Sequence, residues 1–171
     1  VRAVKVVDTT QPVITVKGDV NVIHPIGSAY DDAGATAADT LDGVIDVASA
    51  GTVDSNKLGQ YVISYDASDA NGNKAATKTR TVAVVDLTAP ELTLLGDGEV
   101  EINAGDEYDD VGAIGKDNVD GDISYNISVL SNVDISIPGE YKVTFSLKDA
   151  AGNESSVSRR VNGVDKTAPV V

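Results

Sequence analysis

The stretch Tyr141-Lys-Val-Thr-Phe-Ser-Leu147 places apolar side chains at positions 141, 143, 145 and 147 and polar ones between them. Alternation with a period of two is typical of a β-strand with one buried face and one face in water. The stretch Tyr61-Val-Ile-Ser-Tyr65 likewise begins with a tyrosine shortly after a glycine. Both stretches predict strands of a half-buried sheet.

Other short β-branched runs, bounded by Gly, Asn and Asp, occupy residues 12–16, 81–85 and 91–95. No window keeps helical spacing of apolar residues for three turns. Several short strands separated by turn signals are typical of a small β-sandwich. The sequence therefore predicts an all-β fold, with six to eight strands in each ~79 residues, the spacing at which the chain repeats itself.

An internal repeat organises the chain. The matching segments are DTTQPVIT from Asp8 and DLTAPELT from Asp86, YDDAGA from Tyr30 and YDDVGA from Tyr108, DTLDG from Asp39 and DNVDG from Asp117, LGQY ending at Tyr61 and PGEY ending at Tyr141, and DANGN ending at Asn73 and DAAGN ending at Asn153. The first three pairs are 78 residues apart and the last two 80. Two copies predict two tandem antiparallel β-sandwiches arranged end to end.

The repeat also sets the expected domain boundaries. We expect residues 8–86 and 87–165 to form the two domains. Residues 1–7 resemble the end of a preceding copy, and residues 166–171 the start of a following one. The chain is thus expected to be an interior piece of a longer tandem array.

The aromatic residues recur with the repeat. Tyr30 pairs with Tyr108, Tyr61 with Tyr141, and Tyr65 with Phe145, whereas Tyr125 has no counterpart. Recurrence at fixed positions is what a core requires, so the paired aromatics are interpreted as structural. Tyr61 and Tyr141 also stand where Ig-like domains carry a tyrosine corner.

The order D-x-T-x-P, Y-D-D-x-G-A, D-x-x-D-G, G-x-Y and D-A-x-G-N resembles the bacterial Ig-like repeats of large secreted and surface proteins. This domain type is also found in some pesticidal crystal proteins and has relatives among hyalin repeats. The resemblance covers both copies almost end to end. It implies Ig-like sandwiches used outside the cell as a stalk, a spacer or an adhesin module, and it implies no chemistry.

Composition narrows the function classes. The chain has 171 residues, no Cys, one His and a net charge of -14. The missing Cys excludes disulfides and thiolate metal sites. The negative charge argues against nucleic acid and anionic membranes as partners, and no apolar stretch is long enough to span a membrane. We expect no enzyme, because the single histidine, His24, precedes Pro25 and is interpreted as a surface loop residue.

Of the 27 acidic residues, 21 are Asp, which favours turns over strands. In an Ig-like topology the entry segment and two of the loops lie at one end of the sandwich. The predicted Ca²⁺ ligands are Asp86, Asp117, Asp120, Asp122, Asp149 and Asn153 at this end of the second copy. The same end of the first copy would carry Asp8, Asp39, Asp42, Asp69 and Asn73. Asp31 and Asp32, at the opposite end of the first copy, complete the predicted ligand set, because head-to-tail stacking of the domains would bring them near the Asp86 end of the second copy. Calcium at that junction would stiffen the linker.

A turn interpretation of the same residues stays open. Asp in D-x-x-D-G accepts backbone N–H bonds while Gly takes a positive φ, and D-A-x-G-N is a natural hairpin turn. No EF-hand string is present.

Two functions are therefore weighed. The first is a non-catalytic spacer of a secreted or cell-surface, adhesin-like bacterial protein, whose partners are the neighbouring repeats of the same chain. The alternative is an accessory module of a secreted hydrolase that binds a glycan or a surface protein, with Tyr125 as its one candidate ligand contact.

Overall fold

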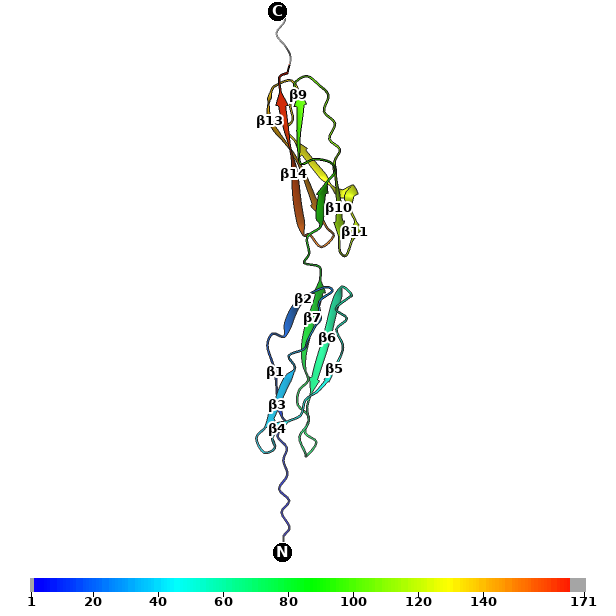
Figure 1. Cartoon of the computed structure of the whole chain (residues 1–171). Coiled ribbons are helices and arrows are strands. Elements are labelled where there is room, and N and C mark those ends of the chain that lie inside the picture. The colour runs from blue at the N-terminus through cyan, green and yellow to red at the C-terminus, as the bar shows by residue number, and fades with distance from the viewer. Residues whose placement is uncertain (1, 167–171) are drawn as a thin grey trace, which may run out of the picture. The chain divides into compact units, whose positions relative to one another are not determined.

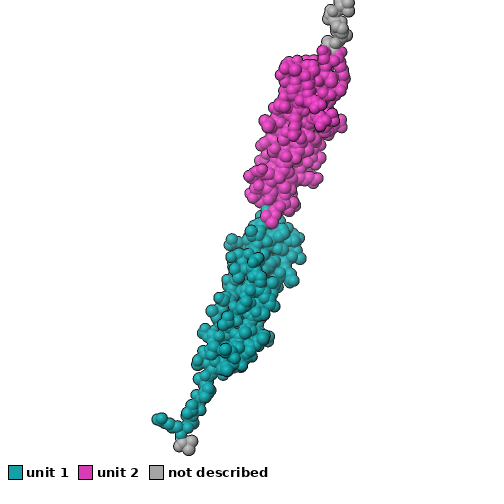
Figure 2. Space-filling model, turned by 90° about the vertical axis from the view of Figure 1, so that its left-hand side faces the viewer, with its two compact units in different colours: residues 1–86 teal, residues 87–171 magenta. Residues whose placement is uncertain are grey.

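The computed structural model describes residues 2–166, which divide into two compact units between Asp86 and Leu87 (Figure 2). Residues 167–171, most of the predicted start of a following repeat, lie outside the described residues. Each unit contains seven strands, and the described helical structure is one short 3₁₀ turn in unit 2. The all-β prediction with two tandem sandwiches is confirmed.

Unit 1 contains two sheets (Figure 1). The strands are β1 (Val13–Val16), β2 (Asn21–Pro25), β3 (Ala35–Asp39), β4 (Gly43–Ile45), β5 (Ala48–Ala50), β6 (Gly59–Asp66) and β7 (Lys78–Val85). One sheet has the order β1-β3-β4 and the other β2-β7-β6-β5.

Unit 2 repeats this plan. Its elements are β8 (Glu91–Leu94), β9 (Glu99–Asn103), β10 (Ala113–Asp117), β11 (Gly121–Asp122), the 3₁₀ turn η1 (Ser124–Asn126), β12 (Ser128–Ser131), β13 (Gly139–Lys148) and β14 (Glu154–Val164). The sheets have the orders β11-β10-β8 and β12-β13-β14-β9.

The core of each unit lies between its two sheets. In unit 1, Ile14 of β1 and Ala37 of β3 share one buried cluster with Ile63 and Tyr65 of β6. In unit 2 the buried cluster contains Val143, Phe145 and Val161 of β13 and β14. The alternation predicted for β13 is confirmed, because Val143, Phe145 and Leu147 are buried and Lys142, Ser146 and Lys148 are exposed.

The sheets are not wholly antiparallel, as the sequence had suggested. β2 pairs with β7 in parallel, from Asn21 opposite Thr81 to Pro25 opposite Val85. β9 pairs with β14 in the same way. The cause is a change of sheet early in each unit: β1 pairs with β3, and after a short bend at Gly18, where φ is 70°, β2 joins the other sheet. A strand that has switched sheets runs beside the last strand in the same direction.

A buried arginine fastens this bend in unit 1. Arg80 of β7 is 2% exposed, and its guanidinium donates to the backbone carbonyls of Lys17 and Asp19 in the bend. It also forms an ion pair with Asp32, which accepts a further hydrogen bond from the Tyr65 hydroxyl at 2.7 Å. Because all of these polar groups are paired, their burial does not leave an unsatisfied charge.

Unit 2 has the equivalent arrangement. Arg159 is 1% exposed, donates to the carbonyls of Leu95 and Asp97, and pairs with Asp110. Burial alone would raise the pKa of Asp110, but hydrogen bonds from Tyr108, the Gly112 amide and Arg159 hold it below its ordinary value. Neither arginine was predicted from the sequence. The signal was present, since each arginine occupies an inward position of an alternating strand.

The structural interpretation of the paired aromatics is confirmed. The Tyr61 hydroxyl donates to the carbonyl of Lys57 at 2.9 Å, and the Tyr141 hydroxyl to that of Ile137 at 2.7 Å. This backbone contact four residues upstream defines a tyrosine corner. Tyr125, the unpaired aromatic, is 81% exposed.

The expectation that His24 is a loop residue is wrong. His24 lies in the edge strand β2, half-buried, with its ring edge-on to Tyr30 at a centroid distance of 5.2 Å. A proline ends this strand, as edge positions allow, because its missing N–H faces away from the sheet. Pro25 therefore does not exclude a strand at His24.

Candidate metal centre

Three segments of unit 1 bring aspartates together at one end of the sandwich. The first is the tight turn from β3 to β4, where Asp39 accepts backbone hydrogen bonds from Leu41 at 2.8 Å and Asp42 at 3.4 Å. Gly43 closes the turn with a φ of 71°, a conformation that favours glycine. This D-x-x-D-G segment therefore forms the turn that its composition indicated, and it fixes the Asp39 carboxylate.

The second segment is the D-A-N-G-N loop between β6 and β7. Asp69 accepts hydrogen bonds from the Asn73 amide at 2.7 Å and the Asn73 side chain at 2.6 Å. Burial raises the pKa of Asp69, but these bonds and those from the amides of Asn71 and Gly72 bring it below the ordinary value. The loop thus holds Asp69 as an anion although its side chain is only 7% exposed.

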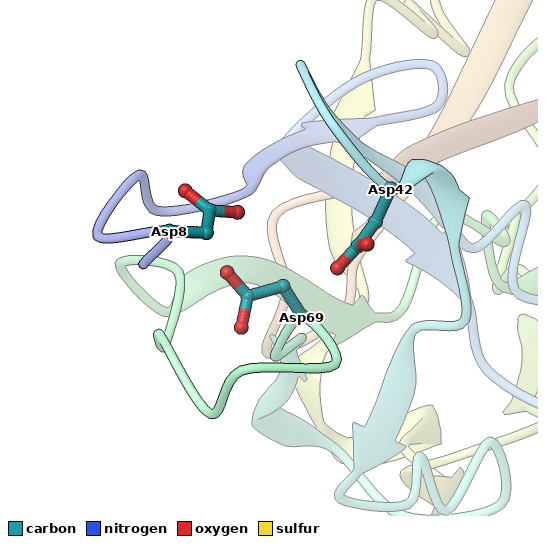
Figure 3. A group of neighbouring side chains, drawn as sticks. All are labelled: Asp8, Asp42 and Asp69. Carbon is teal, nitrogen blue, oxygen red and sulfur yellow. The ribbon is translucent and has the colours of Figure 1, made fainter. Parts of the chain in front are cut away.

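The third segment is the chain that leads into β1. Asn73 also donates to the carbonyl of Asp8 at 3.2 Å, which ties this leading segment to the loop. Carboxylate oxygens of Asp8, Asp42 and Asp69 all lie within 4.8 Å of one another, and Figure 3 shows the three side chains turned toward a common space. Asp42 comes from the β3–β4 turn and is held by the Ala70 amide at 2.9 Å.

Two aspartate oxygens in these three segments are buried without a protein partner. Oδ1 of Asp8 accepts from the Thr10 amide, whereas its Oδ2 is buried and accepts nothing. Asp39 lies in the same turn as Asp42 but is not one of the three residues of the group. It is 9% exposed, and its Oδ2 is likewise buried and unpartnered. A buried carboxylate oxygen without a donor costs free energy.

The second repeat shows the same pattern at equivalent positions. Asp117 accepts from the amides of Val119 and Asp120, and its Oδ2 is buried and unpartnered. Asp149 accepts from Asn153, and Asp120 from the Ala150 amide at 2.7 Å. Oxygens of Asp117 and Asp149, both in unit 2, lie within 4.8 Å of each other. The first group lies wholly within unit 1, and the geometric argument rests on it.

The predicted ligands thus fall into two sets. Within unit 2 the structure brings together Asp117 and Asp149, with Asn153 and Asp120 holding the surrounding loops, and Asp86 is the last residue of unit 1. Asp122 instead accepts from the Ser124 amide and hydroxyl, which holds its pKa below the ordinary value. Asp32 is paired with Arg80 inside unit 1, and Asp31 is exposed. Calcium at a junction between the domains stays a prediction.

Converging carboxylates repel one another. Two unit charges ~4 Å apart at an effective dielectric of ~20 interact by about 4 kcal/mol. Every donor in the group is a carboxylate oxygen, the type preferred by hard cations such as Ca²⁺. The arrangement can therefore hold a divalent cation through the carboxylates of three aspartates.

The fold and the repeated loops define tandem Ig-like domains of the bacterial type. The family model for the Ig-like domain of bacterial surface proteins matches residues 14–84 and 92–162. The chain belongs to this family, as the order of its motifs had indicated. Within the described residues, no helix has both the length and the apolar character needed to cross a membrane.

Two curated relatives match part of the chain. The pesticidal crystal protein Cry22Aa of Bacillus thuringiensis is 32% identical over 106 residues, which are 58% of this chain and 14% of that protein. An uncharacterized 81.3 kDa protein of Acholeplasma phage L2 is 34% identical over 109 residues, 61% of this chain and 15% of that protein. The match thus spans about a seventh of the length of each relative.

Among solved structures, the lipoprotein BT2262 from Bacteroides thetaiotaomicron aligns over 47% of this chain and 40% of that chain. The sequence identity is 24% and the TM-score 0.42, which is too low to support an inference about function.

Proposed function

We propose that the chain is a non-catalytic spacer that transmits tension along a secreted or cell-surface bacterial protein. The observation that carries this proposal is the parallel pairing of β2 with β7, and of β9 with β14. β2 lies near the start of unit 1 and β7 at its end, so a pull on both ends acts along paired strands in opposite directions. The ladder is then loaded in shear, and its hydrogen bonds must break together rather than one after another.

Two further features support a mechanical role. The bend before β2 is fastened by Arg80, and the bend before β9 by Arg159, so the pairing strand is tied to the last strand through a buried side chain as well as the ladder. Each unit also has its own core, which lets it unfold and refold as one module. Family membership supports a place at the bacterial surface.

Single-molecule stretching of the 171-residue chain tests the proposal. We expect two unfolding events, each lengthening the chain by roughly 25 nm, as ~79 residues at ~3.4 Å each minus the folded length require. The variant Ile26→Pro removes the Ile26 amide, which donates to the Val85 carbonyl at 2.9 Å beside the parallel ladder. It should lower the unfolding force of unit 1 alone.

The matched control is Ile26→Ala, which shortens the same half-buried side chain and keeps the amide. Its unfolding force should stay close to that of the parent chain. Unit 2 serves as an internal reference in every trace. Unfolding forces near those of strands that are peeled apart, or equal effects of the two variants, would exclude a shear-loaded spacer.

A second candidate function is glycan binding by unit 2. The exposed Tyr125 directly precedes Asn126, which lines a depression together with Ser146, Lys148 and Glu154. An exposed aromatic ring beside hydrogen-bonding groups suits the apolar face and hydroxyls of a sugar. Binding on a glycan array that disappears in Tyr125→Ala would favour this function, whereas an array without signal would leave the spacer alone.

A further inference from the structure

We propose that the loops of unit 1 form a Ca²⁺ site from Asp8, Asp39, Asp42 and Asp69, and that the second repeat carries the equivalent site. The inference is independent of the spacer role, because it concerns a ligand of each repeat. Its ligand atoms are carboxylate oxygens that the turns already hold in place.

The geometry fits one shared cation. Two oxygens bound to the same Ca²⁺ at ~2.4 Å stand at most ~4.8 Å apart. The oxygens of Asp8, Asp42 and Asp69 meet this limit for every pair. They come from the leading segment, the β3–β4 turn and the β6–β7 loop, so a cation would join three segments that are separate in sequence (Figure 3).

The unpartnered oxygens are the independent sign of a missing partner. Asp39 is more than nine-tenths buried, its Oδ1 is fixed by the turn that carries Asp42, and its Oδ2 is buried with no donor. Asp8, a member of the cluster, also has a buried Oδ2 without a donor. The same is true of Asp117, the residue that corresponds to Asp39 and that belongs to the acidic group of the second repeat. A turn alone requires only one oxygen of each aspartate.

Calcium suits this site better than magnesium. Mg²⁺ demands near-octahedral geometry at 2.0–2.1 Å and retains most of its water, whereas Ca²⁺ accepts 6–8 oxygens in irregular arrangements. Ligands on three separate segments, one of them exposed at Asp42, leave room for water as additional ligands. Soft metals are disfavoured, because the group contains no Cys or His.

The test is a Ca²⁺ titration of the 171-residue chain, followed by two-dimensional NMR and by thermal melting. Extracellular sites of this type bind at about 10⁻⁴–10⁻³ M. We expect amide shifts to cluster at residues 41–43 and 69–73 and at their counterparts in the second repeat. At ~100 times Kd, the unfolding equilibrium should shift ~100-fold and raise Tm by about 10 °C or more.

The double variant Asp8→Asn/Asp42→Asn removes two ligand charges from unit 1 and keeps oxygens that can accept the bonds from Thr10 and Ala70. It should lose the Ca²⁺-dependent shifts in unit 1 and retain those in the second repeat. The matched control, Asp31→Asn/Asp54→Asn, makes the same charge change at exposed aspartates elsewhere in unit 1 and should titrate like the parent.

Three outcomes would overturn the proposal. One is the absence of any shift up to about 10 mM Ca²⁺, well above the expected range. Another is unchanged Ca²⁺ binding to unit 1 in the double variant. The third is loss of binding in the control, which would place the cation at Asp31 or Asp54 instead. Because the titration of the parent chain is itself decisive, a variant that fails to fold does not remove the test.

Discussion

In unit 1 the partly buried Asp32 accepts hydrogen bonds from Tyr65 and pairs with Arg80, whereas in unit 2 the equivalent Asp110 accepts from Tyr108 and pairs with Arg159. The Tyr65 hydroxyl stands 2.7 Å from Asp32, and that of Tyr108 2.5 Å from Asp110. Unit 2 has Phe145 where unit 1 has Tyr65. In unit 1 the Tyr30 hydroxyl also donates to Asp32, but over the longer distance of 3.3 Å.

The difference separates what the fold requires from what it tolerates. The ion pair and the two carbonyls that the arginine satisfies are the same in both units. The shortest hydroxyl contact with the carboxylate comes from Tyr65 of β6 in unit 1 and from Tyr108 of the Y-D-D segment in unit 2. The aromatic ring under the guanidinium remains in both, with centroid distances of 5.8 Å in unit 1 and 6.0 Å in unit 2. A neutral donor to the carboxylate is therefore needed, but its source is free to vary.

The largest effect is expected from removing an arginine. Arg80→Met leaves Asp32 without its cation and the carbonyls of Lys17 and Asp19 without their donor. Breaking a buried pair in this way costs about 3–5 kcal/mol. Hydrogen exchange with mass spectrometry should show the loss in peptides of β6 and β7 and not in those of unit 2. Arg159→Met should show the reverse, and a loss below about 1 kcal/mol would contradict a structural role for the pair.

The next largest effect on stability is expected from removing the Tyr65 hydroxyl, which has no counterpart at Phe145 in unit 2. Tyr65→Phe makes unit 1 resemble unit 2 at this position, but Tyr30 is too far from Asp32 to replace the lost donor fully. A hydrogen bond to a charged group contributes about 1.5–3 kcal/mol, so unit 1 should lose that amount in denaturant unfolding. Phe145→Tyr should stabilise unit 2 by less than this, because Tyr108, Arg159 and the Gly112 amide already donate hydrogen bonds to the Asp110 carboxylate. Equal and opposite effects would show that Tyr108 and Tyr65 do not substitute for each other.

A smaller effect on stability is expected from changing the size of core side chains, because the two units differ in side-chain size at equivalent core positions. Unit 1 has Ala37 and Ala67 at the positions of Gly115 and Leu147. A Cβ at Gly115 would stand 2.2 Å from Leu147 Cδ2, so Gly115→Ala should destabilise unit 2 by about 1–3 kcal/mol through overpacking. In Gly115→Ala/Leu147→Ala the combined loss should be smaller than the sum of the single losses. Strict additivity, measured by denaturant unfolding, would show that the two side chains do not compete for space.

The sequence predicted the sandwich because both of its signals are local. Alternation around Val143 and Phe145 assigns strands, and the repeat assigns two copies. The parallel pair was missed because it follows from a bend at Gly18, and a bend of two or three residues has no periodicity. Arg80 was missed because a charged residue at an inward position is normally interpreted as exposed. Its partner Asp32 had been assigned to a metal instead.

The acidic loops were predicted in part for a topological reason. An Ig-like chain order brings the entry segment and two loops to one end, and Asp8, Asp42 and Asp69 do lie together there. Which oxygens are left without a donor depends on turn geometry at the level of single hydrogen bonds. Asp122 illustrates this: it follows directly after the D-x-x-D-G motif, yet its carboxylate accepts a hydrogen bond from Ser124. Sequence alone does not give that distinction.

The smallest difference between the stabilities of the two units is expected at acidic pH. Burial would raise the pKa of Asp32, but hydrogen bonds from Tyr65 and Arg80 and the Arg80 charge lower it, as the corresponding contacts lower that of Asp110. A folded pKa below the unfolded value of ~3.9 means that the stabilisation is complete above that pH. It is lost as the pH falls through the folded pKa, because the unfolded chain then binds more protons.

Both units should therefore weaken together below pH ~4, and by similar amounts, since each carboxylate pairs with one arginine and accepts a short hydrogen bond from a tyrosine hydroxyl. Hydrogen exchange at pH 5 and pH 3 measures the two units in one sample. In Arg80→Met the acid dependence of unit 1 should become shallower, because Asp32 no longer has a lowered pKa, while that of unit 2 stays unchanged. An acid transition confined to one unit of the parent chain would show that the two ion pairs are not equivalent, whatever their geometry.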